Sequence, residues 1–478
     1  MQSHLASRSL LFATLLAAAA TAQITPGNLV VVRVGDGSAA LTSASTAAFL
    51  DEYTSSGALV QSIPLPTAPA GANLPATVAG SATSEGFLTQ SSDGRYLVCT
   101  GYAAGTGVAA IAGTTSAATP RVIARIALNG TIDSSTSINN LFSAGNIRSA
   151  TTEDGSQFWA AGSNSGVVLA PMAGTTGTQI STTVTNLRVL SVTAGQLYTS
   201  SGSGTTTRCV STVGTGAPTT SGQVITILNG MTSGVASPYD YWFADANTLY
   251  VADDRLSALG GIQKWTQAAG TWTLQYTMNP ALNIGCRGLS GCLENGVATL
   301  FATTTNNLLV TATDTGVASV FSTVVTGVTN TALRGVRLVR TPYNTTFSGT
   351  ACATSVGVPT VGTSGGLPIT GNLAFAIAGG NAPPLTFVLF SLKVGAPLPF
   401  GIPVPGAPAC VAIFVPPDVL LGGGADIGGN ASTPLPVPAN CSLGGASISA
   451  QFVPFDLTLV GFTLPIGSSN AMEIVIGN

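Results

Sequence analysis

One unit recurs between residues 28 and 342: a short apolar run, a turn rich in Asp, Asn and Gly, and a second β-rich run. It returns at intervals of about 40 to 60 residues, the period of β-propeller blades. Clear copies are 86–90, the turn 92–94 and 96–99, and 147–150, the turn 153–155 and 158–161. Each copy predicts a β-hairpin. The chain therefore predicts an all-β fold of hairpin units arranged around an axis.

The number of blades follows from the outer strands and from the two ends of the repeat region. Residues 333–339 match only the first strand of a unit, and 28–34 match a second strand that 49–53 and 58–63 complete. Pairing these ends closes the ring and leaves no strand edge exposed. We predict six blades. Seven is the alternative, if the insertion 67–85 or 103–119 hides another blade.

The composition changes near residue 343, after which Pro and Gly increase and no Arg occurs. Short apolar runs bounded by Gly and Pro predict strands, and they lie at 373–377, 385–392, 411–415, 448–452 and 457–462. We therefore expect a β-propeller over 23–342 and a small β-sandwich over 343–478.

The first 22 residues have the three parts of a secretory signal peptide. Arg8 supplies the positive charge, 10–19 the apolar run, and Ala20-Thr21-Ala22 the small residues of a cleavage site. We expect cleavage after Ala22 and a secreted or cell-surface protein. Later apolar runs are broken by Gly or Pro, so no membrane span is predicted.

The sequence lacks several kinds of chemistry. Its only histidine, His4, lies in the expected signal peptide, and only 7% of residues are charged. Without histidine a Ser-His nucleophile pair cannot form, and the scattered arginines form no basic stripe for nucleic acid. No metal or cofactor is predicted. Calcium is the open alternative at the acidic clusters, which are Glu153-Asp154, Asp245 and Asp253-Asp254.

Seven cysteines and the expected export favour disulfides, with at least one thiol unpaired. Cys286 and Cys292 are poor partners, because six residues of one extended strand span about 20 Å. We predict the pair Cys410–Cys441, which a Gly/Pro-rich loop can bring together.

Several segments resemble known secreted proteins. Residues 92–97 and 153–159 resemble the blade turns of secreted bacterial β-propellers, and 245–252 is similar to surface-layer-type propeller repeats. In the C-terminal part, the pieces similar to a module at the ends of uncharacterised exported bacterial proteins are 369–372, 435–440 and 469–478. The resemblance implies the fold and export, and assigns no chemistry.

Aligning the blades on their turns places six residues at nearly equivalent positions close to the start of each innermost strand. They are Phe87, Arg148, Arg188, Tyr239, Arg287 and Arg334. We expect them to face one end of the central channel. There the guanidiniums and rings either bind an anionic or sugar-like ligand or tie down carbonyls of neighbouring blades.

The sequence thus favours a secreted, non-catalytic binding or scaffold protein whose partner is an extracellular ligand or a surface glycan or protein. The alternative is a sialidase-like hydrolase or lyase acting on anionic carbohydrate, with the arginines binding substrate and Asp, Glu and Tyr doing the chemistry.

Overall fold

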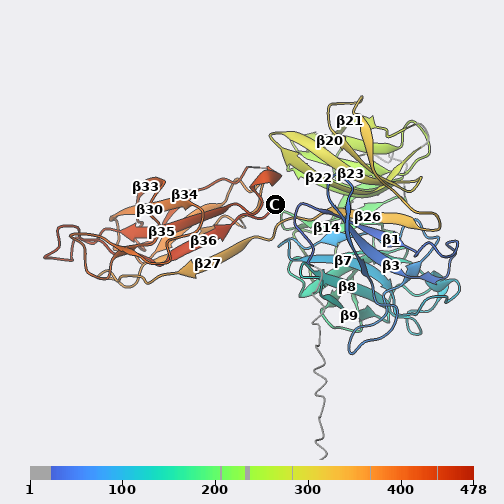
Figure 1. Ribbon diagram of the computed structural model, residues 1–478, viewed down its shortest axis with the longest axis horizontal. Coiled ribbons are helices and arrows are strands. Elements are labelled where there is room, and N and C mark those ends of the chain that lie inside the picture. Colours follow the sequence, from blue (N-terminus) through green and yellow to red (C-terminus); the bar gives the residue numbers. More distant parts are fainter. Residues whose placement is uncertain (1–22, 205–206, 232–236, 282–283, 367, 439) are drawn as a thin grey trace, which may run out of the picture.

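The computed structural model describes residues 23–204, 207–231, 237–281, 284–366, 368–438 and 440–478. These form β-strands, loops and two 3-10 turns, so the predicted all-β class is confirmed. Figure 1 shows a round propeller beside an elongated sandwich, with the C-terminus near their junction. The expected signal peptide, 1–22, lies outside the described residues. Within them, no helix is long and apolar enough to cross a bilayer.

The propeller consists of six four-stranded antiparallel sheets, and the strands of each sheet follow one another from the channel outward. Blade 1 is β26 (Ala332–Leu338), β1 (Leu29–Val34), β3 (Ala48–Tyr53) and β4 (Leu59–Pro64). Blade 2 is β6 (Thr89–Gln90), β7 (Tyr96–Tyr102), β8 (Arg121–Ala127) and β9 (Ile132–Ile138). Blade 3 is β10 (Ile147–Thr151), β11 (Gln157–Gly162), β12 (Val167–Pro171) and β13 (Thr178–Ser181).

The other three blades continue the same order along the chain. Blade 4 is β14 (Leu190–Thr193), β15 (Gln196–Ser201), β16 (Cys209–Val213) and β17 (Ile225–Ile227). Blade 5 is β18 (Pro238–Asp245), β19 (Thr248–Asp253), β20 (Gly261–Ala268) and β21 (Thr271–Met278). Blade 6 is β22 (Cys286–Glu294), β23 (Val297–Thr304), β24 (Leu308–Thr313) and β25 (Phe321–Thr326).

Blade 1 closes the ring as predicted, because β1 pairs with β26 on one side and with β3 on the other. The insertions 67–85 and 103–119 hide no further blade. They contain β5 (Val78–Ala79), which pairs with β2 (Ser45–Thr46), and the 3-10 turn η1 (Ile111–Gly113). The described propeller therefore has six blades.

Apolar side chains pack between neighbouring blades. Ile123 of blade 2 and Phe158 of blade 3 share one core, and Trp159 and Leu197 share the next, between blades 3 and 4. The innermost strands lie so close together that a Cβ at Gly335 would collide with the backbone of Phe87 and Leu88. Glycine at position 335 thus allows blades 1 and 2 to approach closely beside the channel.

The C-terminal part is a β-sandwich. Its larger sheet has the order β27 (Asn344–Ser348), β36 (Ala471–Val475), β35 (Ser447–Pro454), β30 (Phe387–Val394) and β33 (Val419–Gly424). The smaller sheet has the order β28 (Thr360–Ser364), β29 (Ala376–Gly380) and β34 (Ala431–Pro434), and a further pair joins β31 (Ile402–Pro403) to β32 (Ala412–Ile413). Phe390 and Phe452 of the larger sheet pack against Ile377 of the smaller one.

The predicted strand at 457–462 is wrong, because this segment forms turns. Asp456 accepts hydrogen bonds from the backbone N and the hydroxyl of Thr458, which begins a turn at this point. A local side-chain cap of this kind competes with strand pairing. Leu457 and Val460 are consequently exposed.

The predicted Cys410–Cys441 disulfide is also wrong. Cys410 pairs with Cys352 inside the sandwich, and Cys441, on the 3-10 turn η2 (Cys441–Leu443), pairs with Cys292 of β22. The Cα atoms of these two pairs lie 5.3 Å and 5.9 Å apart, respectively. Cys441 faces the propeller, so its nearest thiol comes from the other part of the chain. The buried free cysteines are Cys99, Cys209 and Cys286.

Candidate functional site

The six residues predicted to be equivalent lie at one end of the channel, which we call the arginine end. Arg148, Tyr239, Arg287 and Arg334 lie within the first three residues of their innermost strands, and Phe87 and Arg188 lie two residues before theirs. The common position arises because each innermost strand enters the blade from the same side.

Tyr239 is the centre of this group. The guanidinium carbon of Arg188 lies 3.8 Å from the centroid of its ring, and that of Arg287 lies 5.8 Å away. The ring of Phe87 packs at 5.7 Å from Tyr239, and the stem of Arg334 lies beside Gly86. Cations over an aromatic face are attracted by its quadrupole. The structure therefore brings the predicted residues together.

Each arginine is also tied to a neighbouring segment. Nη1 of Arg148 donates to the Leu187 carbonyl at 2.8 Å, and Nη1 of Arg188 donates to the Pro238 carbonyl at 2.7 Å. Nη2 of Arg334 donates to the Gly80 carbonyl at 3.0 Å. Arg287 instead pairs with a carboxylate, through Nε and Asp254 Oδ2 at 3.2 Å. The arginines thus cross-link the blades.

These contacts use one nitrogen of each guanidinium, and an arginine has five N–H donors. In the described part of the chain, the Nε atoms of Arg148 and Arg334 are buried and have no hydrogen-bond partner. Arg148, Arg188 and Arg287 are only half-buried. Guanidinium groups that are held in place by one nitrogen and still have unused N–H donors are suited to bind an anion.

The positive charges of the arginines at this end repel one another. Burial lowers the pKa of Arg148, and the neighbouring charge of Arg188 lowers it further. Burial and then the charge of Arg287 lower the pKa of Arg334 to about 10. The local positive charge is thus only partly compensated.

Glu85 is the buried carboxyl of this region. It accepts hydrogen bonds from the Tyr102 hydroxyl at 2.7 Å, from the Ala79 backbone N at 2.8 Å, and from the Asn146 side-chain amide. Burial raises the pKa of Glu85. The hydrogen bonds and the charge of Arg334 lower this pKa, but by less than burial raises it. Burial thus disfavours the charged form of this carboxyl group.

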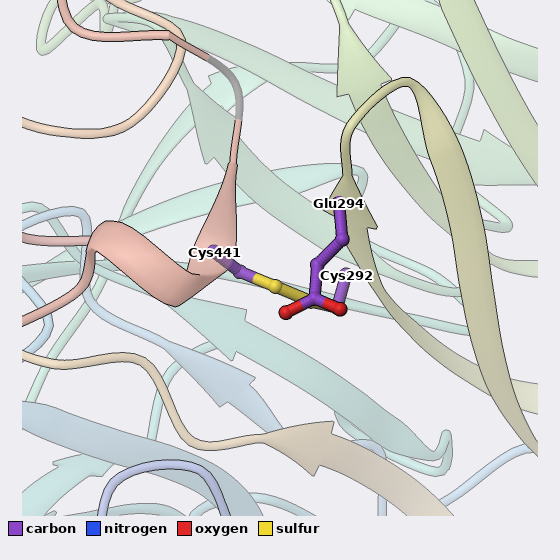
Figure 2. A group of neighbouring side chains, drawn as sticks. All are labelled: Cys292, Glu294 and Cys441. Carbon is purple, nitrogen blue, oxygen red and sulfur yellow. A yellow bond between two sulfur atoms is a disulfide. The ribbon is translucent and has the colours of Figure 1, made fainter.

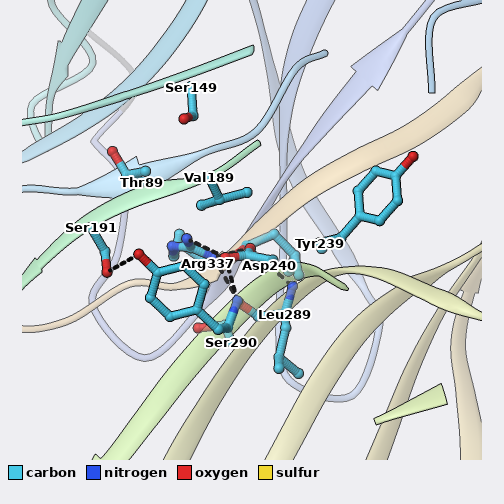
Figure 3. A network of polar contacts seen from close by, with 12 residues as sticks. Thr89, Ser149, Val189, Ser191, Tyr239, Asp240, Leu289, Ser290 and Arg337 are labelled. Atoms are coloured by element: carbon cyan, nitrogen blue, oxygen red, sulfur yellow. Dashed lines mark hydrogen bonds and ion pairs between the residues drawn. The ribbon is translucent and has the colours of Figure 1, made fainter. Parts of the chain in front are cut away.

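Halfway along the channel lies an ion pair that the repeat alignment did not predict. Arg337 of β26 donates to both carboxylate oxygens of Asp240 and to the Leu289 carbonyl (Figure 3). Asp240 is fully buried and also accepts the backbone N–H groups of Tyr241 and Leu289. Arg337 lies three residues after Arg334 on β26, and Asp240 directly follows Tyr239 on β18, so the pair involves residues of two strands that the alignment had already placed in the channel.

The described residues contain one cluster with metal-ligand proximity, Cys292, Glu294 and Cys441 (Figure 2). Both sulfurs belong to the disulfide, so they have no thiolate to offer a metal. At the clusters considered for calcium, Asp154 caps Ser156, Asp253 binds Arg255, and Asp254 binds Arg287. These three aspartates already have partners, and Asp245 accepts the Asn247 backbone N–H.

No protein-family model matches this chain, and no curated protein matches it. Among solved structures, it is similar to a chain of a nidogen/laminin complex, with 13% identity and a TM-score of 0.41 over 65% of this chain and 97% of the other. It is also similar to the periplasmic gluconolactonase PpgL of Pseudomonas aeruginosa, with 12% identity and a TM-score of 0.36 over 86% and 100% of the two chains. Such distant likenesses give no argument about ligand or activity, and the propeller is established by the sheet order itself.

Proposed function

We propose that the protein is an exported, non-catalytic binding protein whose arginine end holds an anionic ligand, such as a carboxylated or sulfated sugar. The observation that carries the proposal is the convergence of Arg148, Arg188, Arg287 and Arg334 around Tyr239, with two buried Nε atoms lacking a partner among the described residues. An anion would accept the remaining donors and reduce the repulsion between the guanidiniums.

The electrostatic contrast supports this assignment. The chain has 15 Lys and Arg against 18 Asp and Glu, yet four arginines lie together at this end of the channel, and of these only Arg287 forms an ion pair among the described residues. A local excess of arginines in a protein of net negative charge attracts anionic ligands to this end of the channel. The aromatic faces of Tyr239 and Phe87 add an apolar contact suited to a sugar ring.

The geometry favours binding over the alternative hydrolase. A sialidase-like mechanism requires a tyrosine made nucleophilic by an adjacent carboxylate. The tyrosine that donates to Glu85 is Tyr102, which is fully buried, and burial raises its pKa. Tyr239 instead has its hydroxyl 3.5 Å from that of Thr83. Neither phenol is arranged as an activated nucleophile.

The test is a calorimetric screen of the full exported chain against sulfated and carboxylated glycans and small anions. Arg188→Gln and Arg287→Gln should weaken binding of a hit at least tenfold. Arg95→Gln is the matched control, because Arg95 is exposed and lies 3.5 Å from Asp93, outside the arginine end. Binding that all three variants retain equally would contradict the proposal.

A further inference from the structure

The opposite end of the channel opens into a cleft of about 1170 Å³ between the propeller and the sandwich. Every blade contributes to its wall, through the turn or strand end that follows its innermost strand. These contributions include Ser92, Glu153, Ala194, Asp245, Glu294 and Arg340. From Arg334 to Arg340 is about 20 Å of extended chain, so the cleft is distinct from the arginine end.

The sandwich forms the facing wall and is held in place. The Cys292–Cys441 disulfide lies at the edge of the cleft beside Glu294 (Figure 2). The Asn440 side-chain amide donates to Asn295 at 3.4 Å, and the Thr341 backbone N donates to Asn478 at 2.6 Å. These links fix the spacing of the two walls, so the cleft is preformed.

Aromatic rings lie along the propeller wall. Tyr198, Trp242 and Phe243 line the cleft and are only half-buried, and Trp272 lies behind them. The rings of Tyr198 and Phe243 are 4.7 Å apart, and those of Phe243 and Trp272 are 6.0 Å apart at a steep angle. Tyr198, Phe243 and Trp272 form one apolar patch on one face of β18, to which the C–H face of a sugar ring can pack. Trp242 lies on the other face of β18, where it stacks on Tyr250.

Polar groups surround this patch. Glu153 and Glu294 line the cleft, and the structure gives neither side chain a hydrogen-bond partner among the described residues. The buried hydroxyl of Ser92, also in the wall, has no partner in the described chain either. Carboxylates and hydroxyls beside aromatic rings match the hydroxyl edge of a sugar, which both donates and accepts.

The charge of the cleft is opposite to that of the arginine end. Three carboxylates, Glu153, Asp245 and Glu294, line it, whereas Arg340 donates to the Ser91 carbonyl. An anionic polymer would be repelled here. An extended peptide is also disfavoured, since the propeller wall consists of turns and strand ends rather than a strand edge to which a peptide could add.

We propose that this cleft binds a neutral oligosaccharide of several linked hexoses, packed on the rings of Tyr198 and Phe243. Its volume exceeds the range of about 300–1,000 Å³ for small-molecule pockets, which fits a chain of sugars better than a monosaccharide. The protein would then have two sites of opposite charge preference at the two ends of one channel.

The test measures binding of neutral hexaosaccharides, namely β-1,4-glucan, β-1,4-mannan and β-1,3-glucan, by calorimetry and tryptophan fluorescence on the full chain. A hit should change the fluorescence, because Trp242 lies in the wall. Tyr198→Ala should weaken it at least tenfold, and Glu153→Gln and Ser92→Ala, which remove no core contact, should weaken it severalfold. Phe387→Ala is the control, since Phe387 is exposed on the sandwich away from the cleft.

Excess sulfate, the probe for the arginine end, should leave the saccharide affinity unchanged, so failure at one site is distinguishable from failure at the other. Three results would overturn the proposal. The first is that none of the three saccharides binds. The second is that Tyr198→Ala and Glu153→Gln, with unchanged melting temperatures, bind the saccharide as tightly as the wild-type protein does. The third is that a proline-rich peptide binds more tightly than the saccharide and displaces it.

Discussion

Arg337 and Asp240 form an ion pair across the channel, with Arg337 Nη1 lying 2.7 Å from Asp240 Oδ2. The pair joins the innermost strands of blades 1 and 5, and the Leu289 carbonyl adds blade 6 to the same network (Figure 3). Since Asp240 is fully buried, the pair links the innermost strands of three blades inside the propeller.

Removing the Asp240 carboxylate should therefore destabilise the folded protein. Asp240→Asn leaves a largely buried guanidinium without its counter-charge, and we expect the free energy of unfolding to fall by about 3–5 kcal/mol. Chemical denaturation measures this change. Asp133→Asn is the control, because Asp133 and Arg125 form a half-exposed pair at 3.5 Å that should contribute less than about 1 kcal/mol. Equal effects of the two substitutions would contradict the bracing role.

The propeller ring is closed by β1, which lies between β26 and β3. Deleting residues 28–34 removes β1, which pairs with β26 and β3 and carries the core residues Val30 and Val32. We expect the variant not to fold cooperatively, because both neighbouring strands lose their partner. A soluble variant with a single sharp thermal transition would show that the ring does not depend on this closure.

The period of the repeat made the propeller predictable. Turns at equivalent positions align the innermost strands, and this alignment also identified the arginine end, since equivalent positions on those strands lie at one height in the channel. The closing blade was predictable for the same reason: a lone first strand at 333–339 and a missing first strand before 28–34 complement each other.

The remaining features depend on contacts between distant parts of the chain. Cys292 and Cys441 are 149 residues apart, and no local pattern indicates that blade 6 meets η2. Asp240 and Arg337 occupy different positions in their repeats, so alignment does not pair them. The cleft forms only because the sandwich lies against one end of the propeller. The composition of residues 343–478 predicts a sandwich but not where it lies.

The disulfide between the two parts can be tested separately. Replacing Cys292 and Cys441 by Ser should increase limited proteolysis between 341 and 350 and separate the thermal unfolding into two transitions, because the covalent link is lost. The control is the same double replacement at Cys352 and Cys410, which should destabilise the sandwich alone. One unchanged cooperative transition in both variants would oppose a linking role.

The pH dependence of stability should reflect Glu85. Burial raises its pKa above 4.5 in the folded state, so the folded state binds the proton more tightly than the unfolded state. The stability from this group is then fully present below about pH 4.5 and is lost as the pH rises through the folded pKa. Glu85→Gln should flatten this decline in denaturation midpoints measured from pH 4 to 8. Identical slopes for both proteins would contradict the assignment.

Diffraction from crystals equilibrated with selenate tests whether the arginine end binds an anion. We expect an anomalous peak beside Tyr239, within reach of Arg148, Arg188, Arg287 and Arg334, and its loss in the Arg188→Gln variant. Selenate bound only elsewhere on the protein, with no peak at this end of the channel, would show that the arginines do not form an anion site.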